Sequence, residues 1–304
     1  MMRYLAFCKI LETGSFTLAA EALGYTQAAI SQMVRSLERE VSFKLLVRTR
    51  SGVRLTPEGE QIYPFLQRIV SAKRELAGKV NELNGLESGE VRIGVFSSLS
   101  QHVLPGLMKA FGDLYPGIQF VLYQGDNKTM PDWLKSGLID FAFMYPSAAT
   151  DLKTDVVAQE QCLAVLPAGH PLAAHQEIPL RALAKEPLIL VEEGGSVNTA
   201  LEAFEKARLT PNIRFRIQDD ATILAMIEEG FGVSILSDMT LAHSAHKVVA
   251  RPTVPKVERT LTVAYPDPVF LPIAAKRFLN YMYEHLPDYM TGTFVRPGTP
   301  KSIK

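Results

Sequence analysis

The chain has 304 residues, 47% of them hydrophobic and 21% charged, and its 32 basic side chains balance 32 acidic ones. This composition is typical of a soluble globular protein, and the length allows two or three hydrophobic cores. No uncharged stretch is long and apolar enough for a membrane span, and the first residues lack the apolar region and cleavage site of a signal peptide. We therefore expect a cytoplasmic protein with no membrane association.

Apolar residues from Tyr4 to Leu11 predict a first helix, and two further amphipathic helices follow it closely. The second and third helices are separated only by Leu23, Gly24 and Tyr25, and Gly24 suits a left-handed helix end. The third helix has an apolar stripe at i, i+3, i+4 and i+7 spacing, which predicts its buried side. This pattern indicates a helix-turn-helix. The opposite face of the third helix carries Ala28, Ser31, Gln32 and Arg35.

A basic segment begins on that opposite face. Between Arg35 and Arg54 six cations stand against two anions. A run of charge is usually only a solvated surface, but one attached to a helix-turn-helix is expected to contact phosphates. Ser51 and Gly52 form the tip of a predicted hairpin, so we assign residues 1–57 to a winged helix-turn-helix domain. The candidate phosphate contacts in the hairpin are Arg48, Arg50 and Arg54.

A long helix is predicted next, with Thr56 as its cap and Pro57 at its first position. Its apolar residues recur in alternating steps of four and three, which is coiled-coil spacing. The alternative, a helix packed only on its own domain, stays open. We expect residues 58–86 to form a linker that dimerises the protein through a seam of Ile62, Leu66, Ile69, Leu76, Val80 and Leu83.

A second domain begins at Val91, where strand-like runs start to alternate with helical ones. This alternation predicts α/β architecture with parallel sheets covered by helices on both faces. The domain is expected to cover residues 91–294, followed by a tail at 295–304. We divide it into one subdomain of residues 91–161 and 267–294 and a second of residues 162–266.

Two polar loops in this domain are candidates for ligand binding, because ligands of open α/β sheets bind beyond the carboxyl ends of strands. Ordinary helix capping is the alternative. The first loop contains no carboxylate, which favours a small polar or anionic ligand, although Glu192 and Glu193 would repel an anion unless they point outward. The candidate ligand contacts are Ser97, Ser98, Ser100, Tyr145, Gly195, Ser196 and Thr199.

Catalytic and metal-binding patterns are missing from the sequence. Neither serine-containing loop carries a nucleophile motif such as GxSxG, and His243 and His246 have only Asp238 nearby as a further metal ligand. The two cysteines, Cys8 and Cys162, lie far apart in apolar runs, which favours buried thiols over a disulfide. We expect no enzyme, no metal and no resident cofactor.

The segment "TGSFTLAAEALGYTQAAISQMVRSLEREVSFKLLVRTRSGVRLTPEGE" resembles the DNA-binding signature of the LysR-type transcriptional regulators, and "GHPLA", "PLILVEEGGS" and "MIEEGFGVSILSD" resemble segments of that family's effector domain. The resemblance implies a domain similar to type 2 periplasmic binding proteins, with an effector in its cleft. It also implies a homodimer or homotetramer on double-stranded DNA, with RNA polymerase as a further partner. It assigns base reading to Gln27, Ala28, Ser31, Gln32 and Arg35, and wing contacts to Arg50 and Arg54.

Two positions depart from the family pattern. Ala28 stands where proline or serine is common, which removes a contact. Ser42 stands where glycine is common, so a turn has to be made without the residue that enters the left-handed region freely. We expect a transcriptional regulator controlled by a co-inducer or co-repressor. The alternative is a solute-binding protein of a transport system, which would share the two-lobed domain but have no use for a winged helix.

Overall fold

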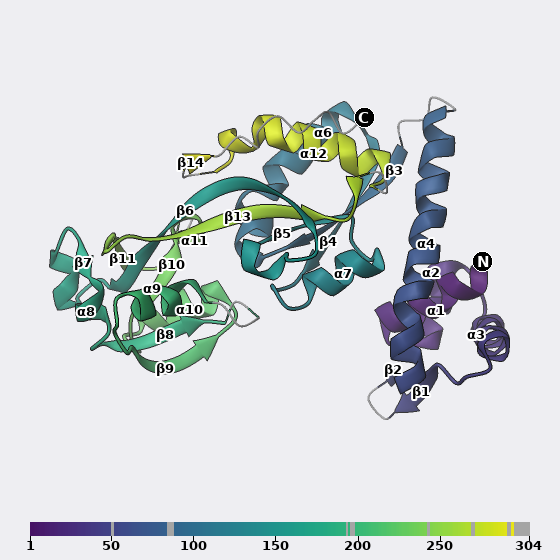
Figure 1. Ribbon diagram of the computed structural model, residues 1–304, viewed down its shortest axis with the longest axis horizontal. Helices are drawn as coiled ribbons and strands as arrows, with labels where there is room; N and C mark the ends of the chain where they lie inside the picture. Colours follow the sequence, from purple (N-terminus) through teal and green to yellow (C-terminus); the bar gives the residue numbers. More distant parts are fainter. Residues whose placement is uncertain are drawn as a thin grey trace. The chain divides into compact units, whose positions relative to one another are not determined.

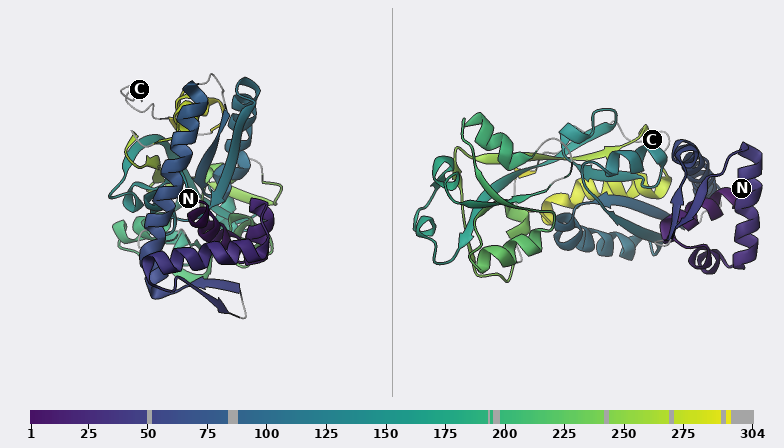
Figure 2. Two further views of the ribbon diagram at one scale, coloured as in Figure 1. Left: turned by 90° about the vertical axis from the view of Figure 1, so that its right-hand side faces the viewer. Right: turned by 90° about the horizontal axis from the view of Figure 1, so that it is seen from below.

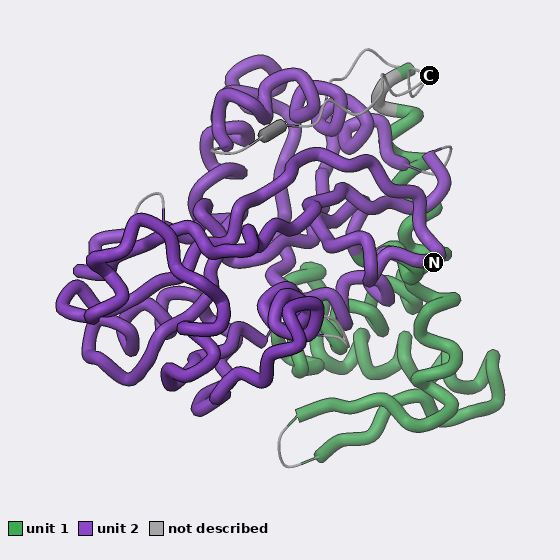
Figure 3. The backbone as a smooth tube through the Cα atoms, turned by 60° about the vertical axis from the view of Figure 1, so that its left-hand side comes forward, with its two compact units in different colours: residues 1–85, 135–138 green, residues 86–134, 139–304 purple. Residues whose placement is uncertain are grey.

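The structure is a computed structural model that describes residues 1–49, 52–83, 88–192, 194, 198–241, 244–268, 271–290 and 293–294. It divides into two compact units (Figure 3). Unit 1 comprises Met1–Gly85 and Lys135–Leu138, and unit 2 comprises Leu86–Leu134 and Ile139–Lys304. None of the described helices is long and apolar enough to cross a membrane.

Unit 1 consists of three short helices, a two-stranded wing and one long helix (Figure 1, Figure 2). These are α1 (Met2–Thr13), α2 (Phe16–Leu23), α3 (Gln27–Val41), β1 (Leu46–Thr49), β2 (Gly52–Leu55) and α4 (Pro57–Leu83). Their shared core includes Phe7 and Ile10 of α1, Ile30 and Leu37 of α3, and Leu66 of α4. The helix-turn-helix and the antiparallel wing therefore form as the sequence predicts.

Local side-chain chemistry sets the ends of the short helices. The Ser15 hydroxyl accepts hydrogen bonds from two backbone N–H groups at the start of α2, and Thr26 accepts one from Ala29 at the start of α3. Gly24 ends α2 in the left-handed region with φ 70°. Ser42 ends α3 with φ 61°, so a non-glycine residue makes this turn despite the steric cost of that region.

Helix α4 does not present one uninterrupted apolar seam. Ile62 and Leu66 pack into the core of unit 1, and Leu66 is only 4% exposed. The sequence assigns both residues to a dimer seam. For Leu66 that assignment is wrong, because the core of unit 1 buries its side chain, whereas Ile62 is only half-buried. Five apolar side chains of the same helix are instead exposed: Phe65, Ile69, Leu76, Val80 and Leu83.

Unit 2 contains one large mixed sheet in the strand order β10-β6-β13-β5-β3-β4, with β11 and β14 also paired to β6. The strands are β3 (Ser88–Val95), β4 (Gly117–Gln124), β5 (Phe141–Met144), β6 (Lys153–Pro167), β10 (Ser234–Ser237), β11 (Val248–Arg251), β13 (Val257–Tyr265) and β14 (Thr293–Phe294). Strands β3, β4 and β5 are parallel, as predicted, whereas β13 is antiparallel to both β5 and β6. The expectation of purely parallel sheets is therefore wrong.

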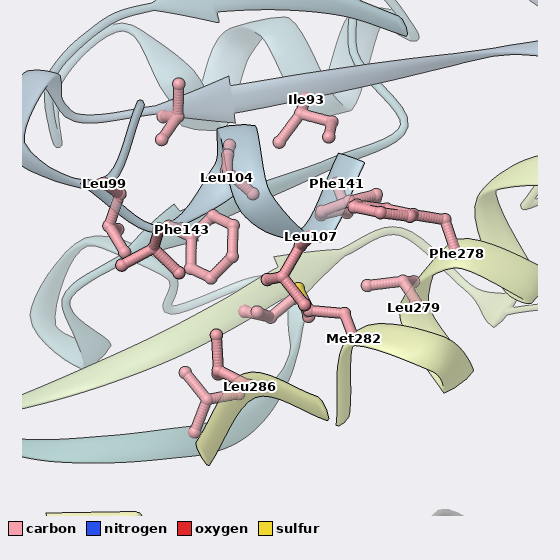
Figure 4. Packing of buried hydrophobic residues seen from close by; sticks show 14 of the residues in the cluster. Ile93, Leu99, Leu104, Leu107, Phe141, Phe143, Phe278, Leu279, Met282 and Leu286 are labelled. Carbon is pink, nitrogen blue, oxygen red and sulfur yellow. The ribbon is translucent and has the colours of Figure 1, made fainter. Parts of the chain in front are cut away.

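Separate hydrophobic clusters divide unit 2 into two lobes, joined by the neighbouring strands β6 and β13 (Figure 1). Lobe I packs α6 (Leu104–Leu114) and α12 (Ile273–His285) on β3 and β5, as Figure 4 shows for Leu107, Phe141 and Phe278. Lobe II has one core around Phe204 and a second cluster that includes Ile189 and Ile223. Its elements include β8 (Pro187–Val191), β9 (Asn212–Ile217), α8 (Leu180–Leu183), α9 (Thr199–Lys206) and α10 (Asp220–Glu228).

Strands β6 and β13 each pass from one lobe to the other. In β6, Val157 belongs to the core of lobe I and Cys162 to that of lobe II. In β13, Val257 belongs to lobe II and Leu261 to lobe I. The chain therefore returns to lobe I inside β13. The sequence pattern puts this boundary at position 266, several residues later.

The shorter elements connect these layers. They are α5 (Ser97–His102), α7 (Met130–Ser136), α11 (Asp238–Leu241), β7 (Ile178–Pro179), β12 (Thr253–Val254) and the 3₁₀ turns Pro146–Ala148, Pro171–Ala174 and Leu286–Asp288. Cys8 and Cys162 are both buried and free. Burial raises the pKa of the Cys8 thiol to about 12, so the thiolate needed for redox chemistry is disfavoured. The expected tail at 295–304 lies outside the described residues.

Candidate DNA-binding surface and ligand-binding cleft

Helix α3 presents a polar face opposite its buried stripe. Ile30, Val34 and Leu37 are at most 3% exposed, which anchors the helix on α1 and α2. The outward residues Gln27, Ala28, Gln32 and Arg35 are exposed, whereas Ser31 is half-buried. The Gln27 side-chain amide donates to the Ser31 hydroxyl over 3.2 Å, so these two polar groups are held together on the accessible face.

The wing carries arginines on both of its faces. Arg48 pairs with Val53 across the hairpin and Arg54 pairs with Val47, and neighbouring residues of a strand point to opposite faces. Both arginines are exposed. The Arg48 guanidinium lies 4.4 Å from the centroid of the Phe16 ring, so this cation packs on α2. Arg50 lies outside the described residues.

A buried carboxylate fixes the wing relative to α3. Glu38 is 8% exposed and accepts backbone hydrogen bonds from Leu45 at 3.0 Å and Leu46 at 3.4 Å, together with an ion pair from Lys44 at 2.7 Å. The Thr56 hydroxyl donates to the Lys44 carbonyl at 2.6 Å. No sequence pattern marks Glu38 for this positioning role, since its partners on the wing follow it by six to eight residues.

A cleft of about 360 Å³ opens in unit 2 between the lobes. It forms where β3, β4 and β5 of lobe I end, where β8 of lobe II ends, and beside β13. Polar, aromatic and charged side chains line it in similar measure. They are Phe96, Ser97, Ser98, Gln124, Asp126, Thr129, Trp133, Tyr145, Glu192, Gln218, Asp220 and Arg259, together with Gly125 and Val191.

One wall of the cleft is a column of stacked side chains. The rings of Phe96 and Tyr145 are stacked with their centroids 5.0 Å apart. The Arg259 guanidinium lies 4.9 Å from the centroid of the Tyr145 ring. Phe96 and Tyr145 directly follow β3 and β5, and Arg259 lies on the neighbouring strand β13, so the strand order itself sets the column.

Arg259 is held at the back of the cleft by a buried ion pair with Glu160, whose side chain is only 1% exposed. Asp220 lies near this pair and accepts a hydrogen bond from the Thr240 hydroxyl at 3.0 Å. Burial raises the pKa of the Asp220 carboxyl, against the opposing effects of Arg259 and Thr240. Charge is therefore concentrated where β6 and β13 connect the lobes.

The predicted ligand contacts lie at several different places. Ser97, Ser98 and Tyr145 line the cleft, but Ser100 does not. The Ser100 hydroxyl donates to the Ser97 carbonyl at 2.9 Å and accepts from Gln124 at 3.0 Å, so it supports a lining residue. Thr199 lines a small adjoining cavity that also contacts Asp220 and Arg259. Gly195 and Ser196 lie outside the described residues.

Two charged lining residues, Asp126 and Arg259, were not among the sequence candidates. Asp126 and Thr129 follow β4 directly, so the rule that singled out the loop after β3 could also have found them. Arg259 lies within a strand, and no local motif marks it. Only the pairing of β13 with β5 and β6 brings it to the cleft.

Residues 2–60 match the helix-turn-helix model of the bacterial regulatory proteins of the lysR family, and residues 84–287 match the LysR substrate binding domain. The chain belongs to the LysR family of transcriptional regulators. It is 34% identical to the uncharacterised regulator YvbU of Bacillus subtilis, with 91% of this chain and 96% of YvbU covered. It is 28% identical to the transcriptional activator CmpR of Synechocystis, with 92% and 93% covered.

Solved structures of the family share the fold. Full-length OxyR from Pseudomonas aeruginosa matches with a TM-score of 0.70 at 24% identity, covering 92% of this chain and 94% of OxyR. Full-length CbnR in complex with its target DNA matches with a TM-score of 0.66 at 20% identity, covering 93% and 98%.

This LysR-family chain is a DNA-binding transcriptional regulator with an effector domain, not a solute-binding protein of a transport system. Proteins of this family are regulators rather than enzymes, and they bind small-molecule effectors rather than cofactors. In the part of the chain that the structure describes, no group of three or more potential metal ligands occurs.

Proposed function

We propose that the chain reads its operator with the outward face of α3 and holds the DNA backbone with the wing. Gln27, Ser31, Gln32 and Arg35 contact base edges in the major groove, and Ala28 leaves room for an apolar contact. The observation that carries this assignment is the exposed polar face of α3 opposite a stripe in which unit 1 buries Ile30, Val34 and Leu37. The backbone contacts are Arg54, Arg48 and Arg50.

The effector in this proposal is a small polar or anionic metabolite that acts as co-inducer or co-repressor in the cleft of unit 2. Ser97, Ser98 and Tyr145 line that cleft, and its volume of about 360 Å³ suits a small ligand. Gly195, Ser196 and Thr199 contribute from lobe II. The protein acts in the cytoplasm as a homodimer or homotetramer joined through α4 and the effector domain, with RNA polymerase as a further partner.

Replacing Arg35 tests the reading face. Guanidinium to guanine is the commonest specific base contact, and one good bidentate pair contributes about 1–3 kcal/mol of discrimination. We expect Arg35→Ala to lose this amount of discrimination between the operator, first selected from random duplexes, and an unrelated duplex. Fluorescence anisotropy with both duplexes measures the ratio of affinities.

Arg54→Ala is the matched control, because Arg54 is an equally exposed arginine on the wing. This variant should weaken binding to both duplexes by the same factor. It should also make the slope of the logarithm of affinity against the logarithm of salt concentration shallower by about one. An unchanged affinity ratio in Arg35→Ala contradicts the assignment of α3 as the reading element.

A further inference from the structure

The cleft of unit 2 carries more negative than positive charge. Among its described lining residues, the carboxylates Asp126, Glu192 and Asp220 stand against Arg259 alone. Glu160 already forms an ion pair with Arg259. A ligand whose only charge is negative would therefore meet three carboxylates and a cation that is largely neutralised. A ligand with a positive group avoids that repulsion.

The charges also have an order along the cleft, which the strand pairing sets. Strands β13, β5, β3 and β4 are successive neighbours in the sheet. Arg259 lies on β13 and Asp126 follows β4, so they stand at opposite ends of this edge. Three strand spacings amount to roughly 14 Å between the backbones. The cleft therefore has an arginine end and a carboxylate end, with the rings of Tyr145 and Phe96 between them.

The carboxylate end receives groups from both lobes. One oxygen of Asp126 accepts hydrogen bonds from the backbone of Lys128 at 3.0 Å and from the backbone and hydroxyl of Thr129 at 2.8 and 2.9 Å. The Asp126 side chain lies directly against Gly194 of lobe II, because a Cβ added to that glycine would lie within 2.6 Å of the Cβ, the Cγ and the second carboxylate oxygen of Asp126. Glu192 is exposed, lines the cleft and precedes Gly194 by two residues.

Trp133 adds an aromatic ring to the lining of the cleft. Carboxylates bind ammonium groups through charge-assisted hydrogen bonds, and an aromatic face attracts a cation further. Asp126, Glu192 and Trp133 together supply the groups that a protonated nitrogen requires. The arginine end offers the hydroxyls of Ser97 and Ser98 and the guanidinium of Arg259, which suit carboxylate or amide oxygens.

We propose that the effector is a small zwitterion of the amino-acid class, with its ammonium group at Asp126 and Glu192 and its oxygen-bearing group toward Ser98 and Arg259. This inference rests on the proposed function, because it takes the cleft as the effector site. It narrows the expected ligand from a small polar or anionic metabolite to a molecule that also carries a cationic nitrogen.

Isothermal titration calorimetry on the full chain tests the inference. The probes are the twenty common amino acids, each compared with the carboxylic acid that lacks its α-amino group. We expect at least one amino acid to bind and its deaminated partner to bind at least tenfold more weakly. The double variant Asp126→Asn, Glu192→Gln should bind the amino acid at least tenfold more weakly than the wild type does. It should also reduce the ratio between the affinities for the amino acid and for the deaminated acid.

The asparagine at position 126 keeps the oxygen that accepts from Lys128 and Thr129, so the loop stays intact while its charge is removed. Glu177→Gln is the matched control, since Glu177 is exposed and does not line the cleft. It should leave every affinity unchanged. Equal or tighter binding of the deaminated acid, an unchanged affinity in the double variant, or binding of no amino acid at all overturns the inference.

Ser98→Ala separates this inference from the proposed function. If a deaminated acid binds and Ser98→Ala weakens it, the cleft is still the effector site and only the amino-acid class is wrong. If Ser98→Ala and the double variant both leave the affinity of a bound probe unchanged, the cleft is not its site, and the proposed function fails as well.

Discussion

At the scale of single residues, Asp219 and Asp220 are neighbours in the chain whose carboxyl pKa values are shifted in opposite directions. The Asp219 carboxylate caps α10 by accepting from the Thr222 backbone at 2.8 Å and from its hydroxyl at 2.6 Å, which lowers its pKa. Burial raises the pKa of Asp220. The first group therefore stabilises the fold as an anion, and the second carries a penalty for its charge.

These shifts predict opposite dependences of stability on pH. A lowered pKa gives Asp219 a stabilising effect that is present above its unfolded pKa near 4 and lost as the pH falls below it. A raised pKa means that folded Asp220 holds its proton longer than the unfolded chain does, so stability decreases as the pH rises from about 4 through the folded pKa.

Asp220→Asn should therefore raise the melting temperature at pH 8, and the gain should shrink toward pH 4, because the asparagine retains an acceptor for Thr240 but carries no charge. Asp219→Ala should lower stability by roughly 0.5–2 kcal/mol, the usual cost of a lost N-cap. Thermal unfolding of the full-length variants across this pH range measures both effects. A gain for Asp220→Asn that grows as the pH falls would contradict the account.

At the scale of elements, α4 has two apolar faces with different partners. Ile62 and Leu66 pack on the core of unit 1, whereas Leu76 and Leu83 are 65% and 75% exposed. Ile69, Leu76, Val80 and Leu83 keep the steps of seven, four and three that a two-helix seam requires. Exposed large apolar residues at this spacing favour a helix that pairs with a second copy.

Leu76→Glu should therefore weaken self-association, since it places an unpaired charge inside the apolar seam. Sedimentation velocity of the full chain over a range of concentrations measures the change. Arg68→Glu is the matched control, because Arg68 is an exposed, already polar residue of the same helix and lies outside the seam spacing. Unaltered association of Leu76→Glu excludes this face as the dimer contact.

Hydrophobic periodicity predicts a helix well when that helix buries one side in a single core. It identified α3, and the short-range chemistry of glycine identified Gly24 as the end of α2. It assigned Leu66 to the wrong partner because the i, i+3, i+4 pattern shows that a side chain is buried and does not show against what. The cleft was found only in part, since Arg259 and Glu160 meet through strand pairings between residues distant in sequence.

At the scale of the whole molecule, control of transcription by an effector requires that ligand binding in unit 2 changes the way in which unit 1 binds DNA. A ligand shifts a protein between two states only as far as it binds them differently. Strands β6 and β13 connect the lobes and place Glu160 and Arg259 at the cleft, so closure around a ligand is expected to act on these strands. By linkage, operator DNA must change the ligand affinity by the same factor as the ligand changes DNA affinity.

The most direct test of this account is the affinity of the full chain for its selected operator, measured by fluorescence anisotropy with and without a saturating ligand that calorimetry has identified. The account predicts that the ligand changes operator affinity at least fivefold for the wild type, a coupling of about 1 kcal/mol. In Ser98→Ala, operator affinity without ligand should stay the same and the ligand effect should be lost at the same ligand concentration. An operator affinity that does not respond to a ligand bound in the cleft would contradict the claim that this cleft controls DNA binding.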